Sequence, residues 1–111
     1  MSDRLPSGML VSAMLRRVND AGGLAVVRAR GDAEGGAILI LLDDRAGPPR
    51  LVERGIGPDG RVVLIDSAPG DSGPSVEDYW RRRRSRDPDL WVIELDIADA
   101  ERFAAETILV D

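Results

Sequence analysis

The stretch Ala37-Ile38-Leu39-Ile40-Leu41-Leu42 is the longest strongly apolar run in this sequence of 111 residues. Successive side chains of a β-strand point to opposite faces of a sheet, so a strand that is apolar at every position is covered on both faces. Such a short run cannot span a membrane. It therefore predicts a central strand, with the rest of the chain arranged around it.

Further strands are predicted on both sides of this run. Residues 24–30 end in alternating apolar and charged side chains, which is typical of a strand with one buried face. Residues 50–54 and 61–65 flank Pro58-Asp59-Gly60, in which proline presets φ for a turn and glycine accepts positive φ. These two strands are therefore predicted to form a hairpin. Residues 31–36 are predicted to be the turn between the first two strands, which makes the four strands a meander.

The first of three predicted helices covers residues 9–21. Its apolar side chains recur at helical spacing, and its charged side chains fall on the other side. Ser7 is its predicted N-cap, and Gly22-Gly23 supplies the left-handed residue that ends many helices.

The back half of the chain is predicted to be a helix, a strand and a helix. The second helix begins near Ser75 and stops at Asp87-Pro88, because the residue before a proline disfavours the helical conformation. Residues 90–95 form the fifth strand, and its place beside the first or the fourth strand is left open. Asp96 is the predicted cap of the last helix, at 97–106.

Together these elements predict an α+β fold in a single domain that spans residues 1–111. The domain is expected to have two layers, with a mainly antiparallel sheet of about five strands and the three helices largely on one face. Residues 66–74 consist mostly of small and turn-forming residues, and this loop is expected to be the most mobile internal segment. It separates the helix and meander of the front half from the back half.

The sequence contains no histidine, cysteine or lysine, so all 15 of its basic residues are arginine. The missing side chains are those that enzymes most often use as proton carriers, thiolate nucleophiles and Schiff-base amines near neutral pH. Their absence excludes Ser-His-Asp triads, zinc fingers and the lysine of a P-loop. It argues against an enzyme, although carboxylates alone or with a metal can still do chemistry. No cofactor is predicted.

Three acidic pairs are candidate ligands for magnesium or calcium: Asp43 with Asp44, Asp32 with Glu34, and Asp96 with Asp99. None matches an EF-hand loop, and we interpret the last pair as helix caps and the first as the end of a strand. No metal site is predicted. The glycine-rich segment 31–36 lacks the lysine and the serine or threonine of a phosphate loop, so we interpret it as a plain turn.

The net charge is −5, which is the wrong sign for a general nucleic-acid binder. The first residues lack the basic start and apolar stretch of a signal peptide, and the absence of cysteine fits a reducing compartment. We therefore expect a cytoplasmic protein with no membrane association.

The most conspicuous cluster is the arginine run 81–84 in the second helix, preceded by an aromatic residue. Trp80, Arg81, Arg82 and Arg84 are the candidate partner-binding residues, either for an acidic protein surface or for nucleic acid. In the alternative interpretation this helix end is solvated and paired within the chain, and Trp80 belongs to the core.

In that alternative, Glu77 pairs with Arg81 and Asp78 with Arg82 at helical spacing, while the stems of Arg83 and Arg84 lie along the edge of the core. Opposite charge is available downstream. Residues 77–86 carry five arginines against two acids, and residues 87–111 carry eight acids against one arginine. Pairing within the chain, or between two copies, would therefore account for the arginines.

Several blocks of the sequence resemble one family of short bacterial proteins. The blocks are 4–8 (RLPSG), 11–19 (VSAMLRRVN), 21–23 (AGG), 30–34 (RGDAE), 36–40 (GAILI) and 87–97 (DPDLWVIELDI). The family is known only as domain of unknown function number 1491. The resemblance covers nearly the whole chain and implies no activity, ligand or catalytic residue.

The sequence therefore favours a small cytoplasmic interaction or binding module without catalysis. Its expected partner is a second copy of the chain, paired through the arginine-rich helix and the acidic C-terminal region, or an acidic protein. A protein that binds nucleic acid through Arg81 to Arg84 is one alternative, and a carboxylate-dependent enzyme is the other.

Overall fold

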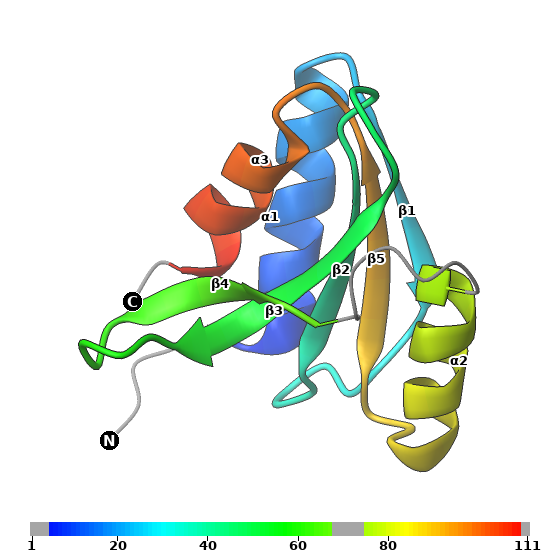
Figure 1. Cartoon of the computed structure of the whole chain (residues 1–111), viewed down its shortest axis with the longest axis vertical. Helices are drawn as coiled ribbons and strands as arrows, with labels where there is room; N and C mark the ends of the chain where they lie inside the picture. The colour runs from blue at the N-terminus through cyan, green and yellow to red at the C-terminus, as the bar shows by residue number, and fades with distance from the viewer. Residues whose placement is uncertain (1–4, 68–74, 110–111) are drawn as a thin grey trace.

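The sheet has the strand order β1–β5–β2–β3–β4, so the last strand of the sequence lies in its interior. The computed structural model describes residues 5–67 and 75–109. Its elements are α1 (Ser7–Asp20), β1 (Leu24–Ala29), β2 (Ile38–Asp43), β3 (Arg50–Ile56), β4 (Val62–Asp66), α2 (Ser75–Arg86), β5 (Trp91–Asp96) and α3 (Ala100–Ile108). The α+β class, the five strands and the three helices are those expected from the sequence (Figure 1).

The meander extends over three strands, β2 to β4, and not over four. β5 inserts between β1 and β2, antiparallel to β1 and parallel to β2. Residues 31–36 therefore cross the end of β5 instead of joining neighbouring strands. The physical reason is burial: β2 and β5 are the two strands with apolar side chains on both faces, and the interior of the sheet is where both faces are covered.

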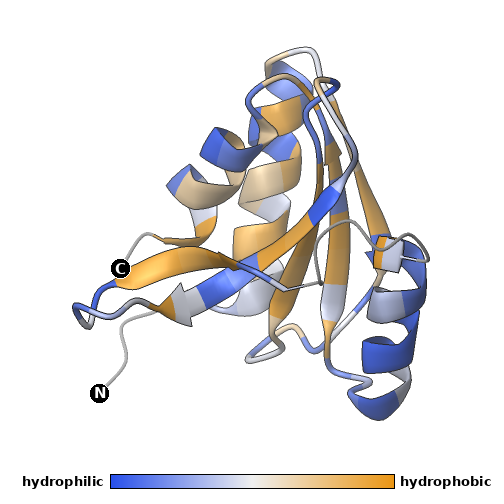
Figure 2. Cartoon of the chain, viewed as in Figure 1, coloured by the Kyte–Doolittle hydropathy of each residue, from blue (hydrophilic) through white to orange (hydrophobic). Residues whose placement is uncertain are grey.

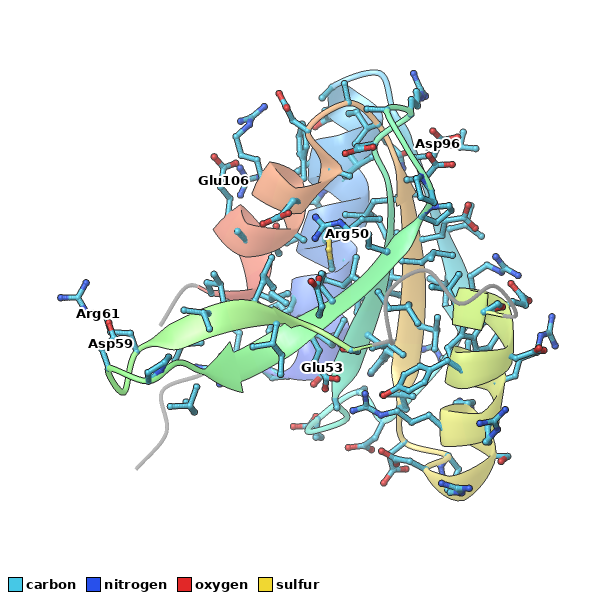
Figure 3. The ribbon with its side chains drawn as sticks, viewed as in Figure 1. Arg50, Glu53, Asp59, Arg61, Asp96 and Glu106 are labelled. Carbon is cyan, nitrogen blue, oxygen red and sulfur yellow. The ribbon has the colours of Figure 1, made fainter. Side chains whose placement is uncertain are left out.

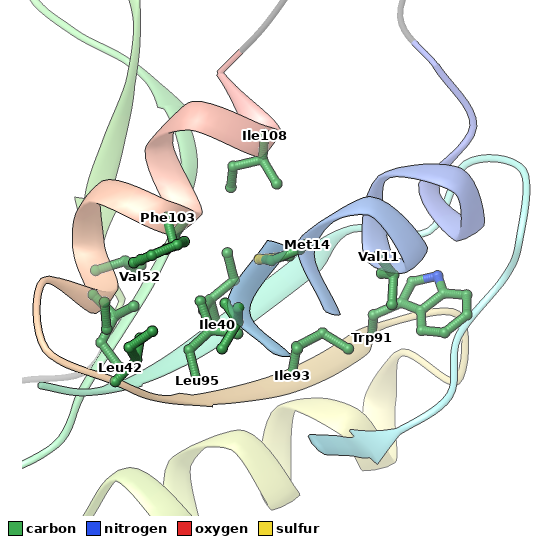
Figure 4. Packing of buried hydrophobic residues seen from close by; sticks show 14 residues of the cluster. Val11, Met14, Ile40, Leu42, Val52, Trp91, Ile93, Leu95, Phe103 and Ile108 are labelled. Atoms are coloured by element: carbon green, nitrogen blue, oxygen red, sulfur yellow. The ribbon is translucent and has the colours of Figure 1, made fainter. Parts of the chain in front are cut away.

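The larger core lies between one face of the sheet and the two helices α1 and α3. Figure 4 shows Val11 and Met14 of α1 packed over Ile40 and Ile93 of the sheet, with Phe103 of α3 beside them. Met14, Ile40 and Ile93 are completely buried. These two helices form the second layer that the sequence predicts.

The third helix, α2, covers the opposite face of the sheet and adds a partial third layer. Trp80 anchors it in a smaller cluster with Leu39, Leu41, Leu51 and, from the chain around β5, Leu90 and Val92. An apolar central strand needs cover on both faces, which is why one helix lies on this side. Figure 2 shows that α2 is otherwise the most hydrophilic element.

Two predicted N-caps are wrong. The hydroxyl of Ser7 donates to the carbonyl of Gly36 at 2.5 Å, so it does not cap α1, and the backbone carbonyls of Ala33 and Glu34 accept from the first amides instead. Asp96 ends β5, and α3 begins three residues later than predicted, after Asp99. The predicted end of α1 is confirmed, because Gly22 has φ 88° and the amides of the glycine pair bond back to the helix.

The hairpin of β3 and β4 is confirmed, with Gly60 at φ 84° in its turn. Its free end swings away from β2. The β2–β3 ladder contains only Ile40–Leu42 and Arg50–Val52, whereas β3 stays paired with β4 as far as Ile56. A gap therefore opens between the start of β2 and the end of β3.

The loop expected at 66–74 lies mostly outside the described residues, since 68–74 are not among them. Asp66 belongs to β4. None of the helices in the described ranges combines the length and the apolarity needed to cross a lipid bilayer.

Candidate functional site

The face of α2 that meets β1 holds two of the predicted site residues, Trp80 and Arg81. Trp80 is only 5% exposed, and the guanidinium groups of Arg81 and Arg28 lie over its ring at 4.9 and 5.4 Å from the ring centre. Arg81 Nε donates to Glu77 at 2.8 Å, as predicted. The indole ring is therefore a core contact covered by arginines of its own chain.

Arg28 connects this face of α2 to the sheet. Its guanidinium donates to Glu94 at 2.8 Å and to Glu77 at 3.1 Å. The hydrogen bond with Glu94 is the main reason that the pKa of Arg28 is raised. Burial pushes the pKa of Glu77 upward, but the hydrogen bond from Arg81 and the charge of Arg28 outweigh it, so this pKa lies below its usual value.

The opposite side of α2 is held by Arg83. It donates two hydrogen bonds to the carboxylate of Glu53 in β3, at 2.5 and 2.7 Å, and the hydroxyl of Ser67 donates a third at 2.6 Å. The hydrogen bond from Arg83 is the main reason that the pKa of Glu53 is lowered, against the effect of burial. This forked pair fastens α2 across the sheet.

The remaining predicted residues, Arg82 and Arg84, differ from each other. Arg84 Nη2 donates to the backbone carbonyl of Arg30 at 2.8 Å, and its side chain is half-buried. Arg82 is exposed, and among the described residues no ion pair joins it to Asp78. Three of the four candidate residues thus contact other side chains or the backbone of their own chain, and Arg82 is exposed without an ion pair among the described residues.

Four acidic residues of 87–111 pair with arginines of the front half of the chain, and one of them, Glu106, also pairs with Arg102. Glu94 binds Arg28, Asp96 binds Arg45 at 2.7 Å, and Glu101 and Glu106 bind Arg50 and Arg17. Figure 3 shows Arg50, Asp96 and Glu106 in the upper half of the molecule, whereas α2 lies at the lower right. The paired acids of this segment therefore compensate arginines outside α2, and not the arginine run itself.

The other acidic candidates shape turns. Carboxylate oxygens of Asp32, Asp43 and Asp44 accept hydrogen bonds from backbone amides two or three residues further on, at 2.8 to 3.1 Å. Within the described ranges no three acidic side chains lie close enough to hold a metal ion.

Replacing Glu53 with glutamine is expected to lower the free energy of unfolding by about 1.5–3 kcal/mol at neutral pH, because a hydrogen-bonded, mostly buried charge pair is lost. Since the pKa of Glu53 is lower in the folded protein than in the unfolded chain, its stabilising effect is present above the unfolded value and disappears as the pH falls through the folded one. Urea unfolding of both proteins over a pH series should show the difference shrinking in acid.

The matched control is Glu106→Gln, which breaks the exposed pair with Arg17. Its expected cost is below about 1 kcal/mol. An equal cost for both substitutions, or a cost for Glu53→Gln that does not change with pH, would contradict this account.

A cavity of about 300 Å³ lies in the gap between β2 and β3. It is lined by Gly36, Ala37 and Ile38 at the start of β2 and by residues 53–56 at the end of β3. Two helices also contribute to the lining: α1 with Leu10 and the buried Ser7, and α3 with Ile108. Arg54 adds a permanent positive charge to the wall. Ile56 at its rim is 68% exposed.

This cavity was not predicted from the sequence. The apolar run 37–42 indicates that β2 is a strand and the turn at 58–60 indicates that β3 is one, but neither signal indicates where a pair of strands separates. The only sequence signal is glycine at three lining positions, and only at Gly35 would an added Cβ meet no atom within 4 Å.

Comparison with known proteins gives a consistent result. A family model described as "Protein of unknown function (DUF1491)" matches residues 5–105. A crystal structure of a DUF1491 family protein from Caulobacter crescentus CB15 is similar, with 32% identity, a TM-score of 0.76, and coverage of 89% of this chain and 94% of the other. No protein with a curated description matches the sequence.

Two solution structures are also similar. An NMR structure of a DUF1491 family protein from Caulobacter crescentus CB15 has 31% identity and a TM-score of 0.74, covering 92% of this chain and 94% of the other. The solution structure of a protein from A. tumefaciens has 30% identity and a TM-score of 0.72, covering 97% of this chain and 96% of the other.

Proposed function

Since the chain belongs to the DUF1491 family of proteins of unknown function, we propose a function from its own geometry. The protein is a non-catalytic interaction module that binds an extended segment of another protein in the gap between β2 and β3. The observation that carries this proposal is the cavity itself, which lies between two strands whose ladder has stopped.

The strand edges support a segment in extended conformation. Trp91 N–H donates to the Ala37 carbonyl, so by alternation Ile38 directs its backbone groups away from β5 and toward the gap. Beyond Ile40 and Val52, the β2–β3 ladder makes no further pairs. An extended peptide bonds to such edges through its main chain, while pockets beside the edge select its side chains.

The lining supports a partner that carries apolar side chains. Leu10, Ile38, Ile56 and Ile108 offer apolar surface, and the volume is at the lower end of what ligand sites enclose. An extended segment with apolar side chains therefore fits the cavity.

The pairing of carboxylates supports a role without catalysis. Glu53, Glu77 and Glu94 are each held by arginine, and ion pairing lowers the pKa of the first two. A carboxylate kept ionised in this way is a poor general acid. With no histidine, cysteine or lysine in the sequence, the usual replacements are absent.

Replacing Gly35 with leucine is expected to abolish binding of the partner while the protein stays folded. Gly35 lines the cavity, and an added Cβ there meets no atom within 4 Å, so a larger side chain can be attached at this point of the wall without a clash at its base. The matched control is Gly47→Leu, which is equally unobstructed and lies in the loop between β2 and β3 at the other end of these strands.

The measurement is affinity capture from an extract of the source organism, followed by circular dichroism of each variant. Wild type and Gly47→Leu should retain the same partner, and Gly35→Leu should retain about tenfold less or none, which corresponds to a loss of at least 1.4 kcal/mol. Equal capture by all three proteins, or no partner for any of them, would rule the proposal out.

The alternatives have less support. A nucleic-acid site at α2 loses the stacking of bases on Trp80, because this ring is buried under two arginines. Self-association through α2 and the acidic region has less support because Arg83, Asp96, Glu101 and Glu106 already have partners within the chain.

A further inference from the structure

The edge strand β1 has more exposed large hydrophobic side chains than any other strand among the described residues. Seven large hydrophobic side chains are exposed in that part of the chain, and three of them, Leu24, Val26 and Val27, belong to this strand of six residues. They are 58, 41 and 38% exposed. Figure 1 shows β1 at the margin of the sheet, with α2 beside its lower end only.

The backbone of β1 is unpaired on this side in the described sheet. Trp91 N–H faces β2, so by alternation Val92, Glu94 and Asp96 direct their backbone groups toward β1. Their register partners Leu24 and Val26 therefore face β5, while Ala25 and Val27 point their N–H and C=O groups outward. The outward pair lies before the bulge that follows Val27.

We propose that β1 of a second copy of this chain pairs with this edge, antiparallel about a two-fold axis at Val26. In that register Ala25 of one copy and Val27 of the other exchange both backbone hydrogen bonds, and the symmetric pair does the same. Val26 meets its counterpart at the centre, in the non-hydrogen-bonded position where side chains come closest. The two sheets become one continuous sheet.

The charge of the edge favours a second copy over a charged partner. β1 has one charged residue, Arg28, and its guanidinium is bound to Glu94 and Glu77 of its own chain. This edge has no unpaired charge for an acidic or basic protein to bind, and an equally neutral, apolar strand edge of a second copy matches it. The edge also lacks the lysine, proline or inward charge that keeps natural edge strands from pairing.

The opposite edge of the sheet provides the matched control. Ile65 of β4 is 42% exposed, nearly the same as Val26, but β4 ends at Asp66, which pairs with Arg50. Val26→Lys places two like charges directly opposite each other at the two-fold axis, whereas Ile65→Lys adds the same charge at the other margin.

Sedimentation equilibrium over a wide range of concentrations tests the proposal. Wild type and Ile65→Lys should reach twice the chain mass, and the dissociation constant of Val26→Lys should rise by about tenfold or more. In wild type, hydrogen exchange of the Ala25 and Val27 amides should slow as the dimer forms. A monomeric wild type, a Val26→Lys dimer of unchanged affinity, or equal weakening by both substitutions would overturn it. This test is independent of the cavity, because Gly35→Leu should leave the dimer intact.

Discussion

Replacing Gly36 with alanine is expected to lower the free energy of unfolding by about 3 kcal/mol, at the upper end of the usual cost of overpacking a buried site. An added Cβ would lie 2.1 Å from the carbonyl oxygen of Asp89 and 3.0 Å from backbone atoms of Asp32. These are main-chain atoms, which cannot rotate aside as the end of a side chain can. Urea unfolding followed by circular dichroism measures the loss.

The loss is expected to be large because three distant segments meet at this glycine. Asp32 N–H donates to the Asp89 carbonyl at 3.0 Å, and Trp91 Nε1 donates to the Asp32 carbonyl at 2.8 Å. The Gly36 carbonyl accepts from Ser7 at the start of α1. Displacing the loop would therefore disturb the start of α1 and the start of β5 together.

The neighbouring residue is the control for Gly36→Ala. Gly35→Ala adds the same methyl group where no atom lies within 4 Å. It is expected to leave stability unchanged or to raise it by about 0.4–1 kcal/mol, because the unfolded chain loses freedom. Similar effects of the two alanines would show that the close approach of Gly36 to Asp89 does not constrain the fold.

Replacing Trp80 with alanine is expected to lower the free energy of unfolding by about 3–5 kcal/mol. The indole is the largest side chain in the cluster under α2, where it covers Leu39, Leu41 and Val92 of the sheet. Without it, α2 keeps Arg83–Glu53 as its main attachment. Since Trp91 remains, its fluorescence can follow urea unfolding of both proteins.

Two further variants separate burial of Trp80 from its contacts with arginine. Trp80→Phe keeps most of the apolar volume and should cost clearly less than alanine. Arg81→Met removes one cation over the ring and the ion pair of Arg81 with Glu77, in which both side chains are exposed. It should lower the free energy of unfolding by about 1 kcal/mol or less. A Trp80→Ala protein as stable as wild type would instead place Trp80 among the residues that serve a partner.

The elements of the fold could be predicted from the sequence because each depends on local chemistry. Alternating side chains indicate β1, a continuous apolar run indicates β2, Gly22 determines the end of α1, and Pro58-Asp59-Gly60 determines the hairpin turn. The strand order depends instead on which strands compete for the interior of the sheet. The two strands that are apolar on both faces, β2 and β5, lie side by side in the interior. No local pattern in the sequence indicates that β5 inserts between β1 and β2.

The candidate site was predictable only in part, for a similar reason. The pair of Glu77 with Arg81 follows from helical spacing. The partners of Arg28 and Arg83 come from other elements, 66 and 30 residues away along the chain. The predicted N-cap of α1 was wrong because backbone carbonyls of a loop distant in sequence accept the hydrogen bonds of the first amides, in place of the Ser7 hydroxyl.

The place of β5 has a consequence for synthesis of the chain. Ribosomes add about 5–20 residues per second, so β2 is complete some seconds before residues 91–96 emerge. Throughout that interval one side of β2 and the whole inner edge of β1 have no neighbour. The sheet therefore cannot be completed until residues 91–96 have been made. Until then the nascent protein exposes two unpaired strand edges, to which chaperones or other nascent chains can bind.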